Sequence, residues 1–176
     1  MQVKRPMITV LILDFDGVIV ESIPLKTVAF RKIFSFVPPA HLDEIIAFHL
    51  ENGGMSRYDK FRYIYANILD EPLTPEQEER LASEYVGLIF DAMLTVPYVE
   101  GAEPLLKDCS RVLPLYIVSA TPEGEMHEIA RRRDLTKYFV RIYGSPKTKA
   151  ECIREILAET GASPGEALFV GDAPND

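Results

Sequence analysis

Four aspartates, arranged as two pairs, are the residues of this sequence best placed to do chemistry. Asp14 and Asp16 follow an apolar run (MITVLIL) whose length and β-branched content are typical of a buried strand. Side chains two residues apart on a strand point to the same side, so both carboxylates would project together. Asp172 and Asp176 follow a second apolar run (ALFV). Ligands bind beyond the carboxyl ends of strands in parallel α/β sheets, and four carboxylates meeting there would repel one another without a cation. The sequence therefore predicts a metal site.

Composition excludes several classes of partner. The chain has 176 residues, 47% of them apolar, and a net charge of −8, which fits a folded domain with a real core. A nucleic-acid binder would show a basic face, and an acidic chain is poorly suited to anionic membranes. No apolar stretch is long enough to span a bilayer. The two cysteines have neither a disulfide pattern nor metal-ligand spacing, so we expect reduced thiols in a cytoplasmic protein.

The hydrophobic pattern predicts a sheet interrupted by a helical insert. After the first aspartate pair the spacing is helical for about seventy residues, and from Gly101 strands and helices alternate again. This order is typical of an α/β fold with a parallel sheet and right-handed crossovers. We expect Thr74 and Thr121, each followed by proline, to cap helices. The predicted helices are 25–36, 42–49, 56–69 and 75–94, with one more ending near 161; the predicted strands are 7–13, 112–118, 139–143 and 167–170.

A family resemblance rests on four short motifs, which occur in the right order along the whole chain. Asp14-Phe15-Asp16-Gly17-Val18, a serine at a strand end (Ser119), a lysine opening a later helix, and Gly171-Asp172 with Asp176 resemble the motifs of the haloacid dehalogenase-like hydrolase superfamily. The resemblance implies a Rossmann-like parallel core, residues 1–22 and 97–176, with a helical cap, residues 23–96, inserted after the first strand. That cap resembles the phosphoglycolate phosphatase and β-phosphoglucomutase branch. We expect the core to continue beyond the last residue given.

The resemblance implies a Mg²⁺-dependent phosphatase that works through an aspartyl-phosphate. Asp14 would be the nucleophile, which divides one hard step into two. Asp16 would protonate the leaving alkoxide and later deprotonate water, and we expect the neighbouring charge to raise its pKa. Mg²⁺ would bind Asp14 and Asp172 directly, Asp16 through its backbone carbonyl, and Asp176 directly or through water.

The remaining motif residues would bind the phosphate. Ser119 would contact a phosphate oxygen, helped by the backbone N–H of Ala120 and by Gly17. One lysine would neutralise the phosphate and orient the nucleophile. Lys149 begins a helical stripe and is favoured, while Lys147 keeps a family-like distance to the last motif.

The predicted cap carries a candidate substrate loop. Gly54-Met55-Ser56-Arg57 resembles the loop that contacts substrate in β-phosphoglucomutase-like caps, so Ser56 and Arg57 are candidate substrate-binding residues. A solvated arginine after a capping serine is the plainer alternative. Lys26 and Lys60 are expected to be solvated surface charges.

Three functions remain open from the sequence. The first is a phosphomonoesterase for a small cytoplasmic phosphorylated metabolite. The second is a phosphomutase, which would use the same residues and return the phosphoryl group to the substrate. The third is a non-catalytic, phosphate-responsive regulator. A dehalogenase is disfavoured because it has no leaving alkoxide to protonate and so no need for Asp16. The sequence motifs do not specify the substrate or the oligomeric state.

Overall fold

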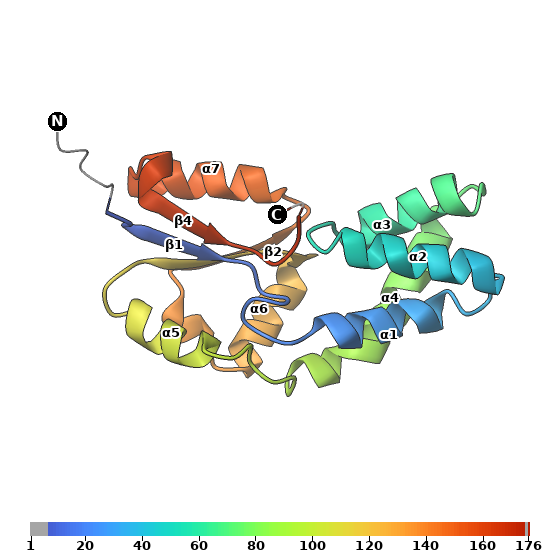
Figure 1. The fold of residues 1–176 in the computed structure, drawn as a ribbon, viewed down its shortest axis with the longest axis horizontal. Coiled ribbons are helices and arrows are strands. Elements are labelled where there is room, and N and C mark those ends of the chain that lie inside the picture. Colours follow the sequence, from blue (N-terminus) through green and yellow to red (C-terminus); the bar gives the residue numbers. More distant parts are fainter. Residues whose placement is uncertain (1–6, 175) are drawn as a thin grey trace.

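A parallel sheet organises one half of the molecule (Figure 1). The computed structural model describes residues 7–174 and 176. The strands lie in the order β3-β2-β1-β4. Strand β1 is central and fully buried, and it pairs in parallel with β2 on one side and β4 on the other. The strands are β1 (Val10–Leu13), β2 (Leu115–Pro122), β3 (Arg141–Ser145) and β4 (Ala167–Val170).

Helices cover both faces of this sheet, as the predicted α/β fold requires. Side chains of alternate β1 residues point to opposite faces of the sheet, with Val10 and Ile12 on one face and Leu11 and Leu13 on the other. Helix α7 packs on the first face, while α5 and α6 lie on the second (Figure 1). These helices are α5 (Ala102–Cys109), α6 (Glu123–Arg132) and α7 (Lys149–Thr160), and two short 3₁₀ turns are Thr136–Tyr138 and Pro164–Glu166.

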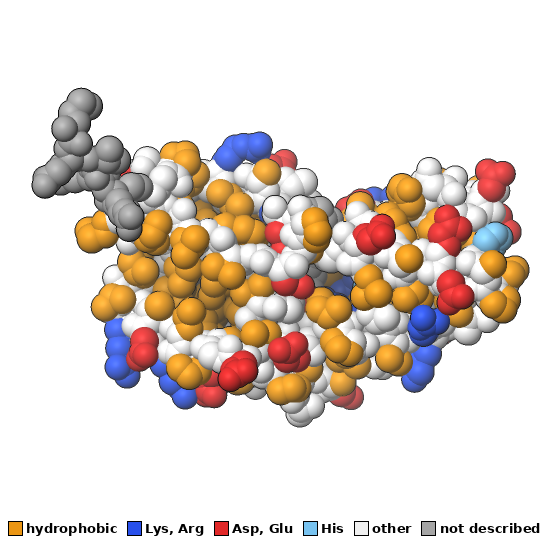
Figure 2. Space-filling view, in the orientation of Figure 1, with side chains coloured by type: hydrophobic (Ala, Val, Ile, Leu, Met, Phe, Trp, Pro, Cys, Tyr) orange, Lys and Arg blue, Asp and Glu red, His pale blue; other side chains and the backbone are white. Residues whose placement is uncertain are grey.

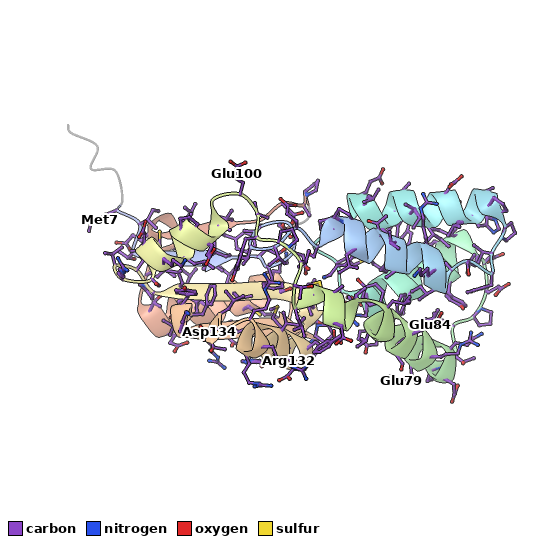
Figure 3. The ribbon with its side chains drawn as sticks, turned by 90° about the horizontal axis from the view of Figure 1, so that it is seen from below. Met7, Glu79, Glu84, Glu100, Arg132 and Asp134 are labelled. Atoms are coloured by element: carbon purple, nitrogen blue, oxygen red, sulfur yellow. The ribbon has the colours of Figure 1, made fainter. Side chains whose placement is uncertain are left out.

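The other half of the molecule is helical and lies beyond the carboxyl ends of the strands (Figure 1). Figure 3 views the whole molecule from below, with Glu79 and Glu84 along α4 (Pro75–Met93) in the helical half and Arg132 and Asp134 near the end of α6 in the sheet half. Buried aromatic side chains fill its centre and are continuous with the core under the sheet. Its elements are α1 (Ile23–Ile33), α2 (Pro39–Glu51), α3 (Arg57–Tyr63), a π-helical turn (Ile64–Ile68) and α4 (Pro75–Met93). The division into core 1–22 and 97–176 and cap 23–96 stays a prediction, and residues 1–6 and 175 of the predicted core lie outside the described residues.

Two capping boxes explain where α4 and α7 begin. Thr74 accepts a hydrogen bond from the Gln77 N–H at the start of α4, as its sequence predicts. Thr148 does the same with Glu151 and makes Lys149 the first residue of α7. In the described part of the chain no helix is long and apolar enough to cross a membrane.

Several predicted boundaries are wrong. Strand β2 starts at Leu115, because Val112 and Leu113 turn back and donate to the carbonyl of Cys109 at the end of α5. Strand β3 starts at Arg141, because the Phe139 N–H still donates to the Thr136 carbonyl and so caps the preceding 3₁₀ turn. Thr121 does not cap α6. It belongs to the end of β2, and its hydroxyl donates to Asp16 instead.

Candidate active site

The carboxyl ends of β1 and β4 bring three of the four aspartates together. Asp14 directly follows β1, and its backbone N–H donates to the carbonyl of Val170 at the end of β4, at 2.9 Å. Carboxylate oxygens of Asp14, Asp172 and Asp176 all lie within 4.8 Å of one another. The two strands therefore converge on a cluster of three acidic groups from distant parts of the sequence.

Asp14 is the buried member of this cluster. Its Oδ1 accepts a hydrogen bond from the backbone N–H of Phe15 at 2.6 Å, and its Oδ2 lies 2.5 Å from Lys149 Nζ. Burial raises the pKa of Asp14 to about 7, against the pull of Lys149, and the charges of Asp16 and Asp176 add to the rise. The carboxyl is fixed in position but needs more positive charge around it to stay ionised.

The structure separates the two candidate lysines. Lys149 bridges the carboxylates of Asp14 and Asp176, and its side chain is 11% exposed. Burial lowers its pKa, but these two carboxylates raise it by more, so the net pKa is above its ordinary value. Lys147 pairs instead with Glu155, and its side chain is 43% exposed. Only Lys149 reaches the acidic cluster.

Asp16 faces a different set of partners from Asp14. Its Oδ2 lies 2.5 Å from Lys26 Nζ, and it accepts hydrogen bonds from Ser22 Oγ at 2.5 Å and Thr121 Oγ1 at 3.2 Å. Burial raises the pKa of Asp16, but Lys26 and the two hydroxyls lower it by more, so the net pKa is below its ordinary value. The expectation that like charge raises this pKa is therefore wrong, because a lysine from α1 neutralises the carboxylate.

The acidic cluster fits a hard divalent cation. It presents carboxylate oxygens, the ligands that Mg²⁺ prefers, and Lys149 is the one described cation that pairs with it. The pKa of Asp172 is raised by burial and by Asp176, as expected for crowded acidic groups. Gly17 allows the close approach, since it has φ +71° and a Cβ there would lie 2.3 Å from Asp172 Oδ2. Coordination by these aspartates, and by the Asp16 carbonyl, remains a prediction.

A cavity of about 100 Å³ opens between this cluster and the helical half. Asp14, Asp16 and Asp172 line it from the sheet side, and Lys26, Arg57 and Lys60 line it from the helices. A larger hollow of about 470 Å³ lies over β1, β4 and α5, where Figure 2 shows many hydrophobic side chains on the surface. That hollow is almost wholly apolar, so the smaller cavity is the one equipped for chemistry.

Some of the residues predicted to contact the phosphate or the substrate line the cavity, and others do not. Ser119 is buried in β2, its Oγ accepts from the Thr121 N–H at 3.1 Å, and it does not line the cavity. Ala120 and Thr121 do line it. Ser56 caps α3 through the Asp59 N–H and lies outside the lining. Its plainer interpretation, as a helix cap, fits the structure better than substrate contact.

Arg57 lies in the cavity wall and joins the two halves of the molecule. Its Nη2 is 2.6 Å from Glu125 Oε2 on α6, and its guanidinium sits 4.7 Å from the centre of the Tyr85 ring. The side chain is 6% exposed, and Nη1 has no hydrogen-bond partner among the described residues. A buried donor without a partner is costly, so a ligand that brought an acceptor to this nitrogen would be stabilised by it.

Two lysines of the site are not predicted by the sequence reasoning above. Lys26 and Lys60 are expected there to be solvated, but Lys26 pairs with Asp16 and Lys60 is buried against His49. A signal is present in the sequence: Lys26 lies four residues before Phe30 and Lys60 four residues before Ile64, so each occupies the buried stripe of its helix.

Comparison with known proteins agrees with this architecture. A curated relative, phosphoglycolate phosphatase 1 from Pseudomonas aeruginosa, is 25% identical over 171 residues, which are 93% of this chain. The chain spans 62% of that relative's length. The fold also matches a β-phosphoglucomutase from Clostridium difficile (TM-score 0.74, 19% identity) over 96% of this chain and 78% of that one. It matches a haloacid dehalogenase-like family hydrolase from Streptococcus pneumoniae (TM-score 0.69, 23% identity) over the same shares.

The match to a family model covers nearly the whole chain. The model describes haloacid dehalogenase-like hydrolases and matches residues 8–176, which include all four aspartates and all four lysines discussed above. Its extent agrees with the parallel sheet, with helices on both faces, that the structure shows. The chain belongs to the haloacid dehalogenase-like hydrolases.

Proposed function

We propose that this protein is a Mg²⁺-dependent phosphatase that hydrolyses small-molecule phosphomonoesters through an aspartyl-phosphate at Asp14. The observation that carries the proposal is the setting of Asp14 itself: a buried carboxylate at a cavity wall, held by Lys149 and flanked by two further carboxylates. Family membership and the similarity to a phosphoglycolate phosphatase support the same reaction class.

Asp14 would act as the nucleophile. The Phe15 N–H fixes one of its oxygens, and Lys149 orients the other while neutralising charge. Attack on phosphorus breaks the bond to the leaving alkoxide, and attack by water then releases phosphate and regenerates Asp14. Asp14, Asp172 and Asp176, with the carbonyl of Asp16, would hold Mg²⁺, which supplies positive charge against the crowded phosphate and carboxylate oxygens.

Asp16 would serve as the proton carrier beside the nucleophile. Phosphoryl transfer needs a proton on the leaving alkoxide and needs one removed from the attacking water. Ionised by Lys26, Asp16 suits the second task in the structure as it stands. For the first task it must carry a proton, so the Lys26 ion pair has to loosen when Asp16 acts as an acid.

The helices at 23–96 would act as a lid that holds the rest of the substrate. Closure of such a lid excludes water and completes the site. Arg57 is the residue proposed to reach the substrate, because it lines the cavity from α3 and keeps one nitrogen unpaired. Arg57→Ala should therefore raise KM for the natural substrate much more than for a small artificial phosphate. Equal losses for both would contradict this role.

The proposal is tested by phosphate release from an aryl phosphate and from a panel of phosphorylated metabolites. Activity should require Mg²⁺ and disappear in Asp14→Asn, while exposed Asp108→Asn should behave as the wild type. Metal-independent turnover, or full activity in Asp14→Asn, would contradict the proposal. With a sugar phosphate, an isomerised product with little free phosphate would identify a mutase instead.

A further inference from the structure

The amine of Lys60 is a buried cation that pairs with no carboxylate among the described residues. Lys60 is 4% exposed, lines the cavity, and places Nζ 3.1 Å from the His49 carbonyl and 3.2 Å from His49 Nδ1. An ammonium carries three N–H groups, and these two acceptors use two of them. One N–H is left for a group in the cavity.

A second unpaired donor comes from the same helix. Arg57 lies three residues before Lys60 on α3, and residues at this spacing are neighbours on a helix surface. Its Nη1 is buried and, within the described residues, has no hydrogen-bond partner. Two cationic side chains of one helix, both lining the same cavity, thus each keep an N–H group without an acceptor among the described residues.

The other cations of the cavity are already neutralised. Lys26 pairs with Asp16, and the Nη2 of Arg57 pairs with Glu125. Lys60 has only neutral acceptors, and an uncompensated buried charge is costly. Burial, with help from the charge of Lys26, lowers the pKa of Lys60 to about 7, and the opposing effect of the Asp16 and Asp172 carboxylates is smaller. A ligand that brings a negative charge would remove this cost.

His49 fixes the direction in which Lys60 can act. Its ring stacks on Phe30, with 4.1 Å between centroids. Burial lowers the pKa of His49 to about 3, helped by the charges of Lys60 and Lys26. The imidazole is therefore neutral at physiological pH, and its Nδ1 can accept a hydrogen bond from Lys60. His49 holds the amine in the cavity wall without supplying any charge.

Building on the phosphatase function proposed above, we propose that Lys60 is a specificity-determining residue that binds a carboxylate carried by the substrate. The two carboxylate oxygens would accept from the N–H of Lys60 Nζ that His49 leaves unused and from Arg57 Nη1. The preferred substrates are then small phosphomonoesters of hydroxy acids. Phosphomonoesters with a neutral tail would bind without this contact.

The test compares two substrates that differ in the tail alone, 2-phosphoglycolate and 2-hydroxyethyl phosphate. The readout is the ratio of their kcat/KM values with Mg²⁺ present. Lys60→Met should lower this ratio by about 10-fold to 100-fold, the usual effect of one hydrogen bond to a charged group. Lys60→Arg keeps the charge and should retain more of the ratio. The control Lys32→Met removes an exposed lysine of α1 and should leave the ratio unchanged.

The dependence on pH gives a second readout that a purely structural role would not move. Lys60 is charged below about pH 7 and neutral above it, so the wild-type ratio should fall as pH rises through this value. Ionisation of the phosphate is common to both substrates and cancels in the ratio. The ratio should be flat in Lys60→Met. The charged or titratable groups around Lys60 are Lys26 on α1, His49 on α2, Arg57 on α3, Tyr85 on α4, and Asp16 and Asp172 at the sheet.

An unchanged ratio in Lys60→Met, or a wild-type ratio independent of pH, overturns the assignment. Failure of the phosphatase function looks different, because neither substrate would then be hydrolysed by the wild type. In that case the carboxylate site is still tested by calorimetry, in which 2-phosphoglycolate is titrated into each protein in the presence of Mg²⁺. Binding at least tenfold weaker to Lys60→Met than to the wild type supports the carboxylate site, and equal binding refutes it. If Lys60→Met does not fold, the wild-type pH dependence decides alone.

Discussion

Replacing Asp14 with asparagine is expected to stabilise the metal-free protein at alkaline pH. Burial raises the pKa of this carboxyl from 3.8 to about 7, so the folded state holds the proton more tightly than the unfolded state does. Between these two values the folded state binds more protons, and stability therefore falls as pH rises. Above the folded pKa the loss is complete. The asparagine side chain of the variant does not ionise, so the variant escapes this loss.

The size of the effect follows from the pKa. Each pH unit between the two pKa values is worth about 1.4 kcal/mol, so raising the pH from about 5.5 to about 8 should cost the wild type roughly 2 kcal/mol at this residue. For a chain of this size that corresponds to about 4–8 °C in Tm. Other titrating groups contribute to both proteins and largely cancel in the comparison. Asp108→Asn, at an exposed position, provides the matched control.

The assay is thermal or urea unfolding of both proteins with a chelator at the two pH values. The difference in unfolding free energy between variant and wild type should grow by roughly 2 kcal/mol from the lower to the higher pH. Adding Mg²⁺ at the higher pH should stabilise the wild type and have much less effect on the variant. If the difference in unfolding free energy does not change with pH, Asp14 is not a buried carboxyl whose ionisation destabilises the fold.

Three further predictions concern the surroundings of Asp14. Lys149→Ala should lower kcat by about 10²–10³, the usual effect of losing a charge-stabilising donor. Lys147→Ala should keep a kcat near that of the wild type, because it breaks only a surface ion pair. Similar losses of kcat for both variants in steady-state assays would contradict the choice of Lys149. Gly17→Ala should lower the free energy of unfolding by at least about 1–2 kcal/mol, since φ at this residue is +71°. It should also weaken Mg²⁺ binding, because the new Cβ meets the Asp172 carboxylate. An unaltered Mg²⁺ affinity would count against that aspartate as a ligand. Lys26→Met should raise the pKa of its carboxylate partner, so the acidic limb of the pH–rate profile should move to higher pH, and an unmoved limb would argue against that partner as the base.

The positions of the candidate site aspartates could be predicted from the sequence because each depends on local signals. An apolar run followed by Asp14 or Asp172 marks a strand end, and strand ends in parallel sheets meet at one edge. The choice between Lys147 and Lys149 was also encoded locally. Thr148 and Glu151 form a capping box, which makes Lys149 the first helical residue.

The electrostatics of the site could not be predicted in the same way. The lowered pKa of Asp16 depends on Lys26, which arrives from a different helix, and on Thr121 from another strand. The burial of Lys60 depends on how α3 packs against α2. A lysine on a buried stripe looks the same in sequence whether its amine reaches solvent or turns into a cavity. Such contacts are set by packing between elements.

The most direct test of the central claim is to trap the phosphorylated intermediate. The wild-type protein is mixed with substrate and Mg²⁺, quenched in acid within one turnover, and reduced with borohydride, which converts an acyl phosphate into an alcohol. Peptide mass analysis then locates the modified residue. The account predicts modification at Asp14, dependent on both substrate and Mg²⁺. Turnover without any trapped residue, or modification at Asp16 or Asp172 in place of Asp14, would contradict it.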